Sequence, residues 1–400
     1  MHIAIIVRRL TNFGGVQRQA LSLAHELKKM GHDIRLYTFA YDRERCYPEL
    51  VGDIPVRALP QDEHLPTTGF FGFINETRMA KRLSKYIDSS TELLHPHCII
   101  SHHVAYFYKK NIKHIPSVWN LNELPAMRWP IEMLEMVENP EYHDIPKKPL
   151  WYKKLVILLR NAYDRFFVQK QDVITVFDTF HQKMLERYAG RKSTIVPSGL
   201  DIDRFQYLYH ESPSREKKLF LLTSGIFLSY RRFEDIISAL PILIEKGLDP
   251  ELSIFGDYSC DKKYHKKLIE LSRRLGVENR VVYKGTYLDE ELMKAFAESH
   301  IFVFPHLQSQ GLSVYESIAA GLPTVITPVP GTYETLHHKR EVMVAEVKNP
   351  VSLAAALDEL ATDPTLYQTL SKDGSKYVRT NFSWRQYAEG MNAIFKKVGN

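Results

Sequence analysis

The stretch that most constrains the fold is residues 301–335, which follows the pattern of one strand–helix–strand unit. Residues 301–304 (Ile-Phe-Val-Phe) are an unbroken apolar run, typical of a strand buried on both faces of a parallel sheet. Residues 311–320 then carry apolar side chains at helical spacing, and the following Gly321 and Pro323 end that helix. A second apolar run at 324–327 completes the unit. The pattern predicts an α/β fold with parallel strands.

The loop inside this unit predicts a ligand site. In parallel α/β sheets, ligands bind where strands end and helices begin, because free N–H groups and the helix dipole attract anions there. We therefore expect residues 308–313 to face the site. Glu316, about one turn inside the helix, could accept hydrogen bonds from a pair of sugar or ribose hydroxyls. The alternative is a helix-stabilising acid that binds nothing.

The length and composition indicate a globular protein of two domains. A chain of 400 residues is too long for one ordinary core, and 44% hydrophobic with 25% charged residues is a globular composition. No apolar run reaches the ~18 residues of a membrane-spanning helix. The N-terminal run 3–7 is only as long as a buried strand and lacks a following cleavage site, so we do not expect a signal peptide.

Cysteine usage and charge suggest the compartment and the kind of partner. The three cysteines, Cys46, Cys98 and Cys260, form no C-x-x-C pair and fit a reducing compartment, which predicts a cytoplasmic protein. The net charge of +6 favours an anionic partner such as a phosphate-bearing substrate or a membrane face. No helix-turn-helix, RRM or zinc pattern accompanies this charge, so we expect no nucleic-acid partner.

Four histidines surround one predicted strand in the first half of the chain. His95, His97, His102 and His103 bracket residues 98–101, which we predict as a strand. A metal site is disfavoured because no acidic or Cys ligand is spaced with them. We expect His102 or His103 to be a polar residue at the rim of a cleft.

Residues 308–316, Gln-Ser-Gln-Gly-Leu-Ser-Val-Tyr-Glu, resemble the E-G-F-G-L-x-x-x-E segment of retaining family-4 glycosyltransferases with the GT-B fold. Gly311, Leu312 and Glu316 match this pattern, while Gln308 replaces its first Glu. Residues 319–325 match the A-x-G-x-P-V-V stretch that follows. The resemblance implies two Rossmann-like doubly wound domains facing each other across a cleft, with a nucleotide-sugar held mainly by the second domain.

The same resemblance implies the domain boundaries. Residues 193–205, STIVPSGLDIDRF, are similar to the V-I-P-N-G-V-D-x-x-x-F link of the family. We therefore expect an acceptor-side domain at 1–198 and a nucleotide-sugar-binding domain at 199–382. A terminal helix at 383–400 is expected to return to the first domain.

The turn at 225–232 resembles the G-R-L-x-x-x-K-G element whose Arg and Lys neutralise the donor diphosphate. Ile226 replaces the family's Arg, Arg231 falls on its Lys, and Arg232 falls on its last Gly. Two cations beside a helix N-terminus still predict a phosphate clamp. The alternative is an ordinary solvated Arg pair.

Two segments of the first domain also resemble the family. Gly14 to Arg18 is similar to its G-G-x-x-R helix opening, where Gly15 would let the backbone approach the donor phosphate or the acceptor. Asn122 stands where the family has a His that contacts the donor sugar, and an amide can also donate to and accept from a hydroxyl.

These matches give the expected site. The residues expected in catalysis are Arg231, Gln308 and Asn122. The residues expected to bind the donor are Gly14, Gly15, Gly225, Arg231, Arg232, Ser309, Gln310, Gly311, Leu312, Ser313 and Glu316. No metal and no cofactor are expected, because the resemblance implies a metal-independent enzyme whose nucleotide diphosphate sugar is a substrate.

The resemblance thus implies a retaining hexosyltransferase that acts on a glycan or glycolipid acceptor hydroxyl, with lipid-linked glycan or surface polysaccharide synthesis as its setting. No carboxylate is evidently placed as a nucleophile, so a same-face reaction is the more economical mechanism. Two alternatives stay open. One is a binding protein that has lost catalysis, since Ile226, Asn122 and Gln308 depart from the family pattern. The other is a nucleotide-sugar epimerase of the same fold.

Residues 147–170 combine apolar residues and cations. Apolar side chains recur at helical spacing from 151 to 166, with Lys153 and Arg160 predicted on the opposite face. This pattern is typical of a basic amphipathic surface that contacts anionic lipid, which would make the protein membrane-associated. The alternative is a helix that packs its apolar stripe onto its own domain.

Overall fold

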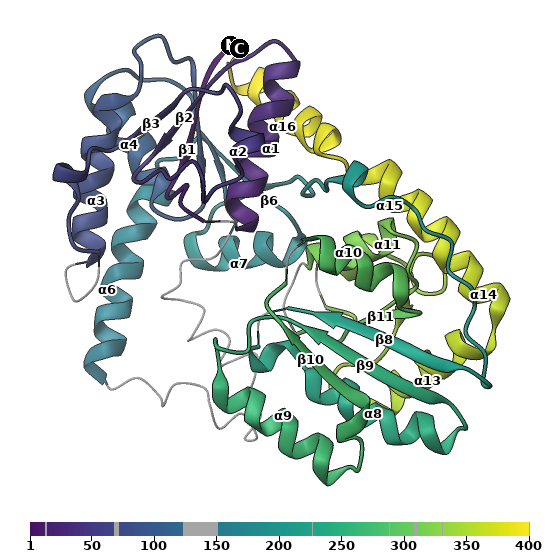
Figure 1. The fold of residues 1–400 in the computed structure, drawn as a ribbon. Helices are drawn as coiled ribbons and strands as arrows, with labels where there is room; N and C mark the ends of the chain where they lie inside the picture. Colours follow the sequence, from purple (N-terminus) through teal and green to yellow (C-terminus); the bar gives the residue numbers. More distant parts are fainter. Residues whose placement is uncertain are drawn as a thin grey trace. The chain divides into compact units, whose positions relative to one another are not determined.

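The computed structural model describes residues 1–12, 14–67, 72–122, 151–225, 227–287, 289–307, 311–329 and 331–399. The chain forms two compact units, one of Met1–Gly199 with Trp384–Asn400 and one of Leu200–Ser383 (Figure 1). The expected domain boundaries, after residues 198 and 382, each lie one residue before the boundaries of these two units. Each unit is a parallel sheet with helices on both faces, so the predicted α/β fold is confirmed.

The sheet of the first unit has seven parallel strands in the order β3-β2-β1-β4-β5-β6-β7. The strand order therefore reverses between β1 and β4, where Ile3 is paired with Leu93. The strands are β1 (His2–Val7), β2 (Asp33–Thr38), β3 (Val56–Ala58), β4 (Leu93–His97), β5 (Val118–Asn120), β6 (Val173–Val176) and β7 (Thr194–Ile195).

Alternating residues of β1 pack into two different hydrophobic cores of this unit. Ile3, Ile5 and Val7 pack in one core with the apolar faces of α1 and α16, while Ala4 and Ile6 pack in the other with α3 and α4. The helices of the unit are α1 (Gly15–Lys29), α2 (Pro48–Val51), α3 (Gly72–Leu83), α4 (Ser101–Asn111), α6 (Trp151–Val168), α7 (Thr179–Ala189) and α16 (Trp384–Gly399).

The second unit has six parallel strands in the order β10-β9-β8-β11-β12-β13, so its strand order reverses between β8 and β11. The strands are β8 (Lys218–Ser224), β9 (Asp249–Phe255), β10 (Val281–Gly285), β11 (Ile301–Phe304), β12 (Thr324–Ile326) and β13 (Met343–Val344). The helices are α8 (Phe233–Glu245), α9 (Lys262–Arg274), α10 (Asp289–Glu298), α11 (Leu312–Ala319), α12 (Thr332–Thr335), α13 (Pro350–Thr362), α14 (Pro364–Thr369) and α15 (Ser375–Asn381). One core contains α8, α9 and α13, and the other contains α10, α11 and α15.

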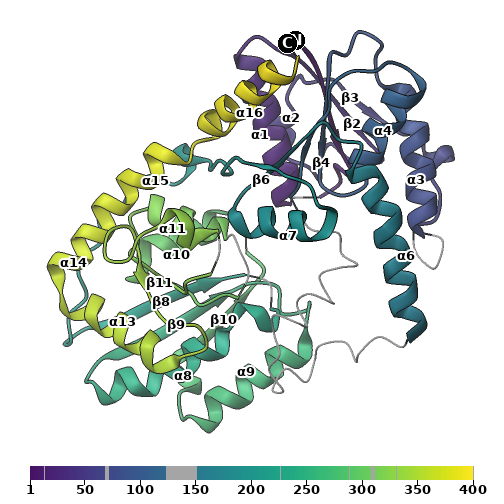
Figure 2. The same ribbon diagram turned by 180° about the vertical axis from the view of Figure 1, so that it is seen from behind.

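The terminal helix α16 belongs to the first unit, as the family resemblance implies. Its residues Tyr387, Met391 and Phe395 are buried in the core that also contains Leu21 of α1. Figure 2 shows α16 beside α1 from the opposite side. The His32 ring also hydrogen-bonds to Asn392 of α16 over 3.0 Å.

The predicted strand at 98–101 is wrong. The strand is β4 (Leu93–His97), and α4 begins at Ser101 after a turn in which Cys98 and Ile100 have positive φ of 65° and 68°. The buried leucines at 93 and 94 begin the strand. His95 is accommodated within it because its Nδ1 hydrogen-bonds to the Val118 carbonyl over 2.6 Å.

Part of the predicted apolar stripe of α6 is exposed to solvent. Leu158 and Leu159 are each 61% exposed, and Phe166 is 47% exposed although its ring packs edge-on against Tyr106 of α4. Arg160, predicted on the outer face, is half-buried with its guanidinium 4.8 Å above the Phe73 ring. The inward face of α6 therefore carries polar contacts and part of the apolar stripe faces solvent. None of the described helices combines the length and apolarity needed to cross a membrane.

Candidate functional site

The carboxyl edge of the second sheet, at the reversal between β8 and β11, is the place where open α/β sheets bind ligands. Backbone hydrogen bonds join the turns that leave this edge. The Gly225 N–H donates to the Phe255 carbonyl over 2.9 Å, and the Gly256 N–H donates to the Gly285 carbonyl over 2.8 Å. The Leu307 N–H donates to the Tyr230 carbonyl over 2.9 Å. The turns after β8, β9, β10 and β11 therefore form one connected surface.

Glycine is required where these turns approach one another. Gly225 and Gly256 have φ of 152° and 153°, and a Cβ on Gly256 would collide with the Gly225 carbonyl. A Cβ on Gly225 would lie 3.0 Å from Nε of Arg231. The missing side chain at Gly225 therefore lets the Arg231 guanidinium lie over the backbone, which supports the expected place of both residues in the site.

Arg231 ends a short 3-10 turn, η4 (Ser229–Arg231), and points to the end of β11. Its Nη1 donates to Nδ1 of His306 over 2.7 Å, and its guanidinium carbon lies 5.2 Å from the Tyr230 ring centroid. Burial lowers the pKa of Arg231, yet an arginine remains charged at neutral pH. Its Nε is buried without a hydrogen-bond partner, and no described carboxylate pairs with the guanidinium. A partly buried cation whose described partners are all neutral favours an anionic ligand.

His306 positions this cation and was missed by the sequence analysis. The ring is fully buried and stacks on Phe304, and its backbone carbonyl accepts a hydrogen bond from Thr327 Oγ1 over 2.7 Å. Burial, and then the Arg231 charge, lower the pKa of His306 well below its usual value. The imidazole is therefore neutral at physiological pH and can accept from Arg231. The sequence signal that could have identified His306 is its position directly after the buried strand β11 and Pro305.

The N-terminus of α11 lies at the same edge. Its N-cap residue is Gly311, where a Cβ would collide with the Phe304 ring, and no acidic side chain lies in the first turn. Leu312 and Ser313 are the first two residues of the helix, so their N–H groups have no acceptor within it. These groups form the positive end of the helix dipole. This is an anion-binding arrangement at the predicted loop.

Glu316 lies one turn inside α11 and is only 9% exposed. Burial first, and then the Glu316 charge, raise the pKa of Tyr287, while the Arg231 charge lowers it. The Tyr287 ring packs edge-on against Phe255 at the end of β9, with 5.4 Å between the ring centroids. Tyr287, in the turn after β10, is a second site residue that the sequence analysis missed.

The Arg232 guanidinium pairs with carboxylates in the first turn of α8. Arg232 has a left-handed φ of 56°, its Nε donates to Asp235 over 2.9 Å, and its Nη1 lies 2.8 Å from a Glu234 carboxylate oxygen. Its charge is thus balanced by α8, unlike that of Arg231. Donor binding by Arg232 stays a prediction. The predicted site residues Gln308, Ser309 and Gln310 lie outside the described part of the chain, and so does Ile226.

In the first unit, the Gly14–Gly15 turn opens α1 at the carboxyl end of β1. Gly14 is the N-cap, with φ of −129°, and a Cβ on Gly15 would meet no atom within 4 Å. The Gln17 amide fixes the turn by donating to the Arg9 carbonyl over 3.0 Å. The open space at Gly15 supports the predicted backbone approach to a ligand, which stays a prediction.

Asn122 is held by a polar network of the first unit. Its Oδ1 accepts from the Cys98 N–H over 3.1 Å, and its Nδ2 donates to Gln19 Oε1. Gln19 also accepts from Asn120 over 3.0 Å and donates to Ser198 over 2.9 Å. The network fixes the Asn122 side chain, and its expected contact with a donor sugar stays a prediction.

The expected rim position of His102 and His103 is wrong, because both rings are buried. His102 stacks on Trp119 and His103 stacks on Phe167. Their Nε2 atoms lie 3.2 and 3.3 Å from one Asp164 oxygen. The sequence analysis found no acid spaced with these histidines, because α6 brings Asp164 to them only in three dimensions. The three side chains could together ligate a metal. Burial raises the pKa of Asp164, but the two histidines lower it overall.

Two Rossmann-like units, the second with an anion-binding arrangement at its strand reversal, form the architecture of the GT-B fold. Comparisons with known proteins agree with this class. Residues 208–377 match the family model described as glycosyl transferases group 1, and residues 13–204 match that of glycosyltransferase family 4. The chain belongs to the group 1 glycosyltransferases.

Similar proteins match over nearly the whole chain. An uncharacterised glycosyltransferase of Methanocaldococcus jannaschii is 24% identical over 96% of this chain and 94% of its own. The mannosylfructose-phosphate synthase of Agrobacterium fabrum is 22% identical over 95% of this chain and 86% of its own. The crystal structure of Anabaena HepE with UDP-glucose has a TM-score of 0.73 and 14% identity, covering 99% of this chain and 100% of that one. The last likeness supports the fold.

Proposed function

We propose that this glycosyltransferase moves a hexose, with retention of anomeric configuration, from a nucleotide diphosphate sugar to an acceptor hydroxyl. The observation that carries the proposal is the Arg231 guanidinium, which is partly buried at the strand reversal and pairs with no described carboxylate. The diphosphate of a nucleotide-sugar is the anion that fits beside it and the N-terminus of α11. HepE, of the same fold, has been crystallised with UDP and with UDP-glucose.

The proposed chemistry follows from the charges at this edge. Breaking the anomeric bond leaves negative charge on the departing diphosphate, and the Arg231 guanidinium and the first N–H groups of α11 stabilise that charge. The departing phosphate oxygen takes the acceptor proton on the face where the new bond forms, so no enzymic nucleophile is needed. The positive charge is supplied by the protein, which fits a reaction without a metal.

The first test is incubation of the purified protein with UDP-, GDP- and ADP-hexoses and candidate acceptor glycans. We expect release of nucleoside diphosphate and formation of a glycoside whose anomeric configuration, read by NMR, is that of the donor. An inverted product would refute retention. Binding without turnover would favour the alternative of a protein that has lost catalysis, and epimer formation would favour the epimerase alternative.

Glu316 is proposed to accept hydrogen bonds from donor hydroxyls. We expect Glu316→Gln to weaken donor binding by about 10-fold, because a hydrogen bond to a charged acceptor contributes roughly 1.5–3 kcal/mol and the amide retains part of it. Isothermal titration calorimetry with the active nucleotide-sugar measures the change. Glu298→Gln, on an exposed end of α10, is the control. Donor affinity equal to wild type would assign Glu316 to helix stability alone.

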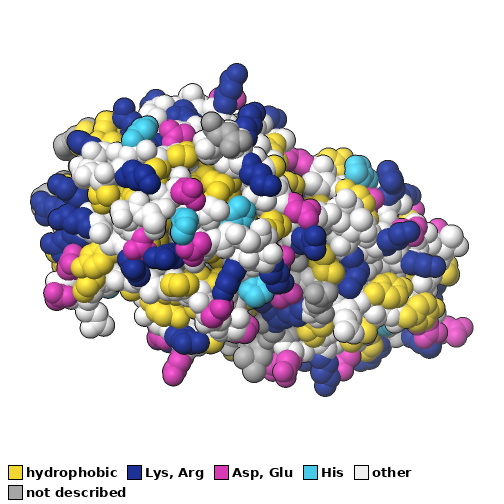
Figure 3. All heavy atoms as spheres, turned by 90° about the horizontal axis from the view of Figure 1, so that it is seen from above, with side chains coloured by type: hydrophobic (Ala, Val, Ile, Leu, Met, Phe, Trp, Pro, Cys, Tyr) yellow, Lys and Arg dark blue, Asp and Glu magenta, His cyan; other side chains and the backbone are white. Residues whose placement is uncertain are grey.

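A second proposal is that the acceptor lies on an anionic lipid surface, so that the enzyme is membrane-associated and acts in lipid-linked glycan or surface polysaccharide synthesis. Leu158, Leu159 and Phe166 of α6 are exposed beside the exposed cations Arg165 and Lys170. Lys and Arg side chains also gather along the edge of Figure 3 that corresponds to the side of α3 in Figure 1. Exposed apolar residues flanked by cations favour an anionic interface.

We expect the protein to float with vesicles in proportion to their anionic lipid content, and less as salt rises. The double variant Leu158→Gln/Leu159→Gln should reduce flotation several-fold, because it removes the apolar contact. Val351→Gln, on an exposed residue of α13, is the control. Flotation that is indifferent to lipid charge and to the double variant would contradict this proposal.

A further inference from the structure

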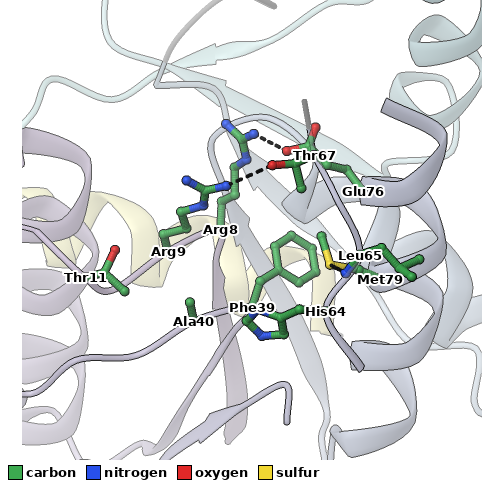
Figure 4. A pocket seen from close by; sticks show the side chains of 10 residues that line it. All are labelled: Arg8, Arg9, Thr11, Phe39, Ala40, His64, Leu65, Thr67, Glu76 and Met79. Atoms are coloured by element: carbon green, nitrogen blue, oxygen red, sulfur yellow. Dashed lines mark hydrogen bonds and ion pairs between the residues drawn. The ribbon is translucent and has the colours of Figure 1, made fainter. Parts of the chain in front are cut away.

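A pocket in the first unit has no role in the site described above. It has a volume of about 250 Å³ and lies at the carboxyl ends of β1 and β2 (Figure 4). The residues that line it are Arg8, Arg9, Thr11, Phe39, Ala40, His64, Leu65, Thr67, Glu76 and Met79. Its size suits one small group or ring and is too small for an oligosaccharide.

The pocket carries more positive than negative charge. Glu76 is its one acidic lining residue, and this carboxylate pairs with Arg8. Glu76 also interacts with Arg160, which α6 places beside it. Arg9, by contrast, donates to the neutral Thr67 Oγ1 over 3.3 Å, and no carboxylate of the described residues pairs with it. Arg8 thus neutralises the acidic lining residue, and an anion beside Arg9 would be attracted.

Neutral polar groups and an apolar surface complete the pocket. Figure 4 shows Arg8 and Arg9 reaching toward Thr67 and Glu76 above the Phe39 ring. Phe39 is buried, and the buried Met79 lies beside it. The His64 ring is engaged with the Leu59 carbonyl over 3.2 Å. An apolar floor beneath guanidinium groups suits a sugar-like ring that bears an anionic substituent.

A hydrogen bond connects a lining residue of the pocket to the turn that opens α1. The Gln17 amide that fixes the Gly14–Gly15 turn donates to the carbonyl of Arg9 itself. A ligand held by the Arg9 guanidinium would therefore lie close to the open space at Gly15, at the same edge of the sheet. We propose that this pocket binds an anionic group, a phosphate or a carboxylate, carried by the acceptor. This rests on the proposed function, and it makes the acceptor an anionic sugar or a similar small polyol.

Arg9 is the residue to test, because replacing Arg8 would leave Glu76 buried without one of its partners. Binding of glucose 6-phosphate, glucuronate and glucose is measured by NMR titration of wild type, Arg9→Gln, Arg9→Lys and the control Arg45→Gln, which changes an exposed arginine outside the pocket. We expect wild type to bind an anionic probe more tightly than glucose. Arg9→Gln should lose about 10- to 100-fold of that affinity, the loss expected for one charge-assisted hydrogen bond. Arg9→Lys should retain part of it.

Transfer assays separate this proposal from the proposed function. With an anionic acceptor, Arg9→Gln should raise the acceptor KM by a similar factor and leave kcat and donor hydrolysis in the absence of acceptor unchanged. Absence of all nucleotide-sugar turnover in wild type would refute the proposed function alone, since anion binding is read separately. Anion binding equal in wild type and Arg9→Gln, or no preference of wild type for either anionic probe over glucose, would overturn the pocket assignment.

Discussion

Arg231→Ala is expected to lower turnover by about 10²- to 10³-fold, the loss typical of one strong donor that stabilises transition-state charge. Donor binding should weaken much less, because the charge on the departing diphosphate grows only as the bond breaks. Arg231 has this role because its guanidinium is partly buried, is held by the neutral His306 and has no described carboxylate partner. Steady-state kinetics with the active nucleotide-sugar, together with calorimetric donor affinity, measure the two effects.

Three further variants test whether the loss of turnover is specific to the Arg231 guanidinium. Arg231→Lys should restore part of the activity, because it returns the charge without the two-pronged guanidinium geometry. Arg232→Ala should act mainly on stability, because its guanidinium is bound to Asp235 and Glu234 of its own helix. Arg273→Ala, on the exposed face of α9, is the charge-matched control. If Arg232→Ala lowered turnover more than Arg231→Ala, the phosphate-binding role would belong to Arg232.

Gly256→Ala is expected to destabilise the second unit by about 3 kcal/mol or more, the combined scale of backbone strain and overpacking. At φ of 153° a Cβ is strained, and it would also collide with the Gly225 carbonyl. Moving that carbonyl would displace the turn over which the Arg231 guanidinium lies. Activity should therefore fall even in the fraction of molecules that stay folded. Chemical denaturation of wild type and variant measures the stability change.

The matched control for this substitution is Gly276→Ala in the same unit. Gly276 also has a positive φ, 68°, but a Cβ there would meet no atom within 4 Å. Its cost should be about 1 kcal/mol, from the left-handed backbone alone. Equal destabilisation by the two variants would show that the Gly225–Gly256 contact gives way on substitution and does not hold the turn in place.

The sequence by itself determined the features that depend on neighbours in the chain. The buried strand at 301–304, the helix after Gly311 and the stop at Gly321 each follow from local periodicity and backbone preference, and the structure has all of them. The sequence also predicted that the loop before Glu316 lies where a strand ends and a helix begins, and the structure has residues 305–311 between β11 and α11.

Tertiary structure alone decided which side chains neutralise one another. Arg231 and Arg232 are adjacent in sequence, yet among the described residues only Arg232 pairs with carboxylates, because its left-handed backbone turns the side chain onto α8. Asp164 reaches His102 and His103, and Arg160 turns inward toward Phe73, through the packing of α6, which its apolar spacing did not predict. Whether a charge is balanced depends on distances of a few ångströms between segments far apart in the chain, and sequence spacing carries no information on these distances.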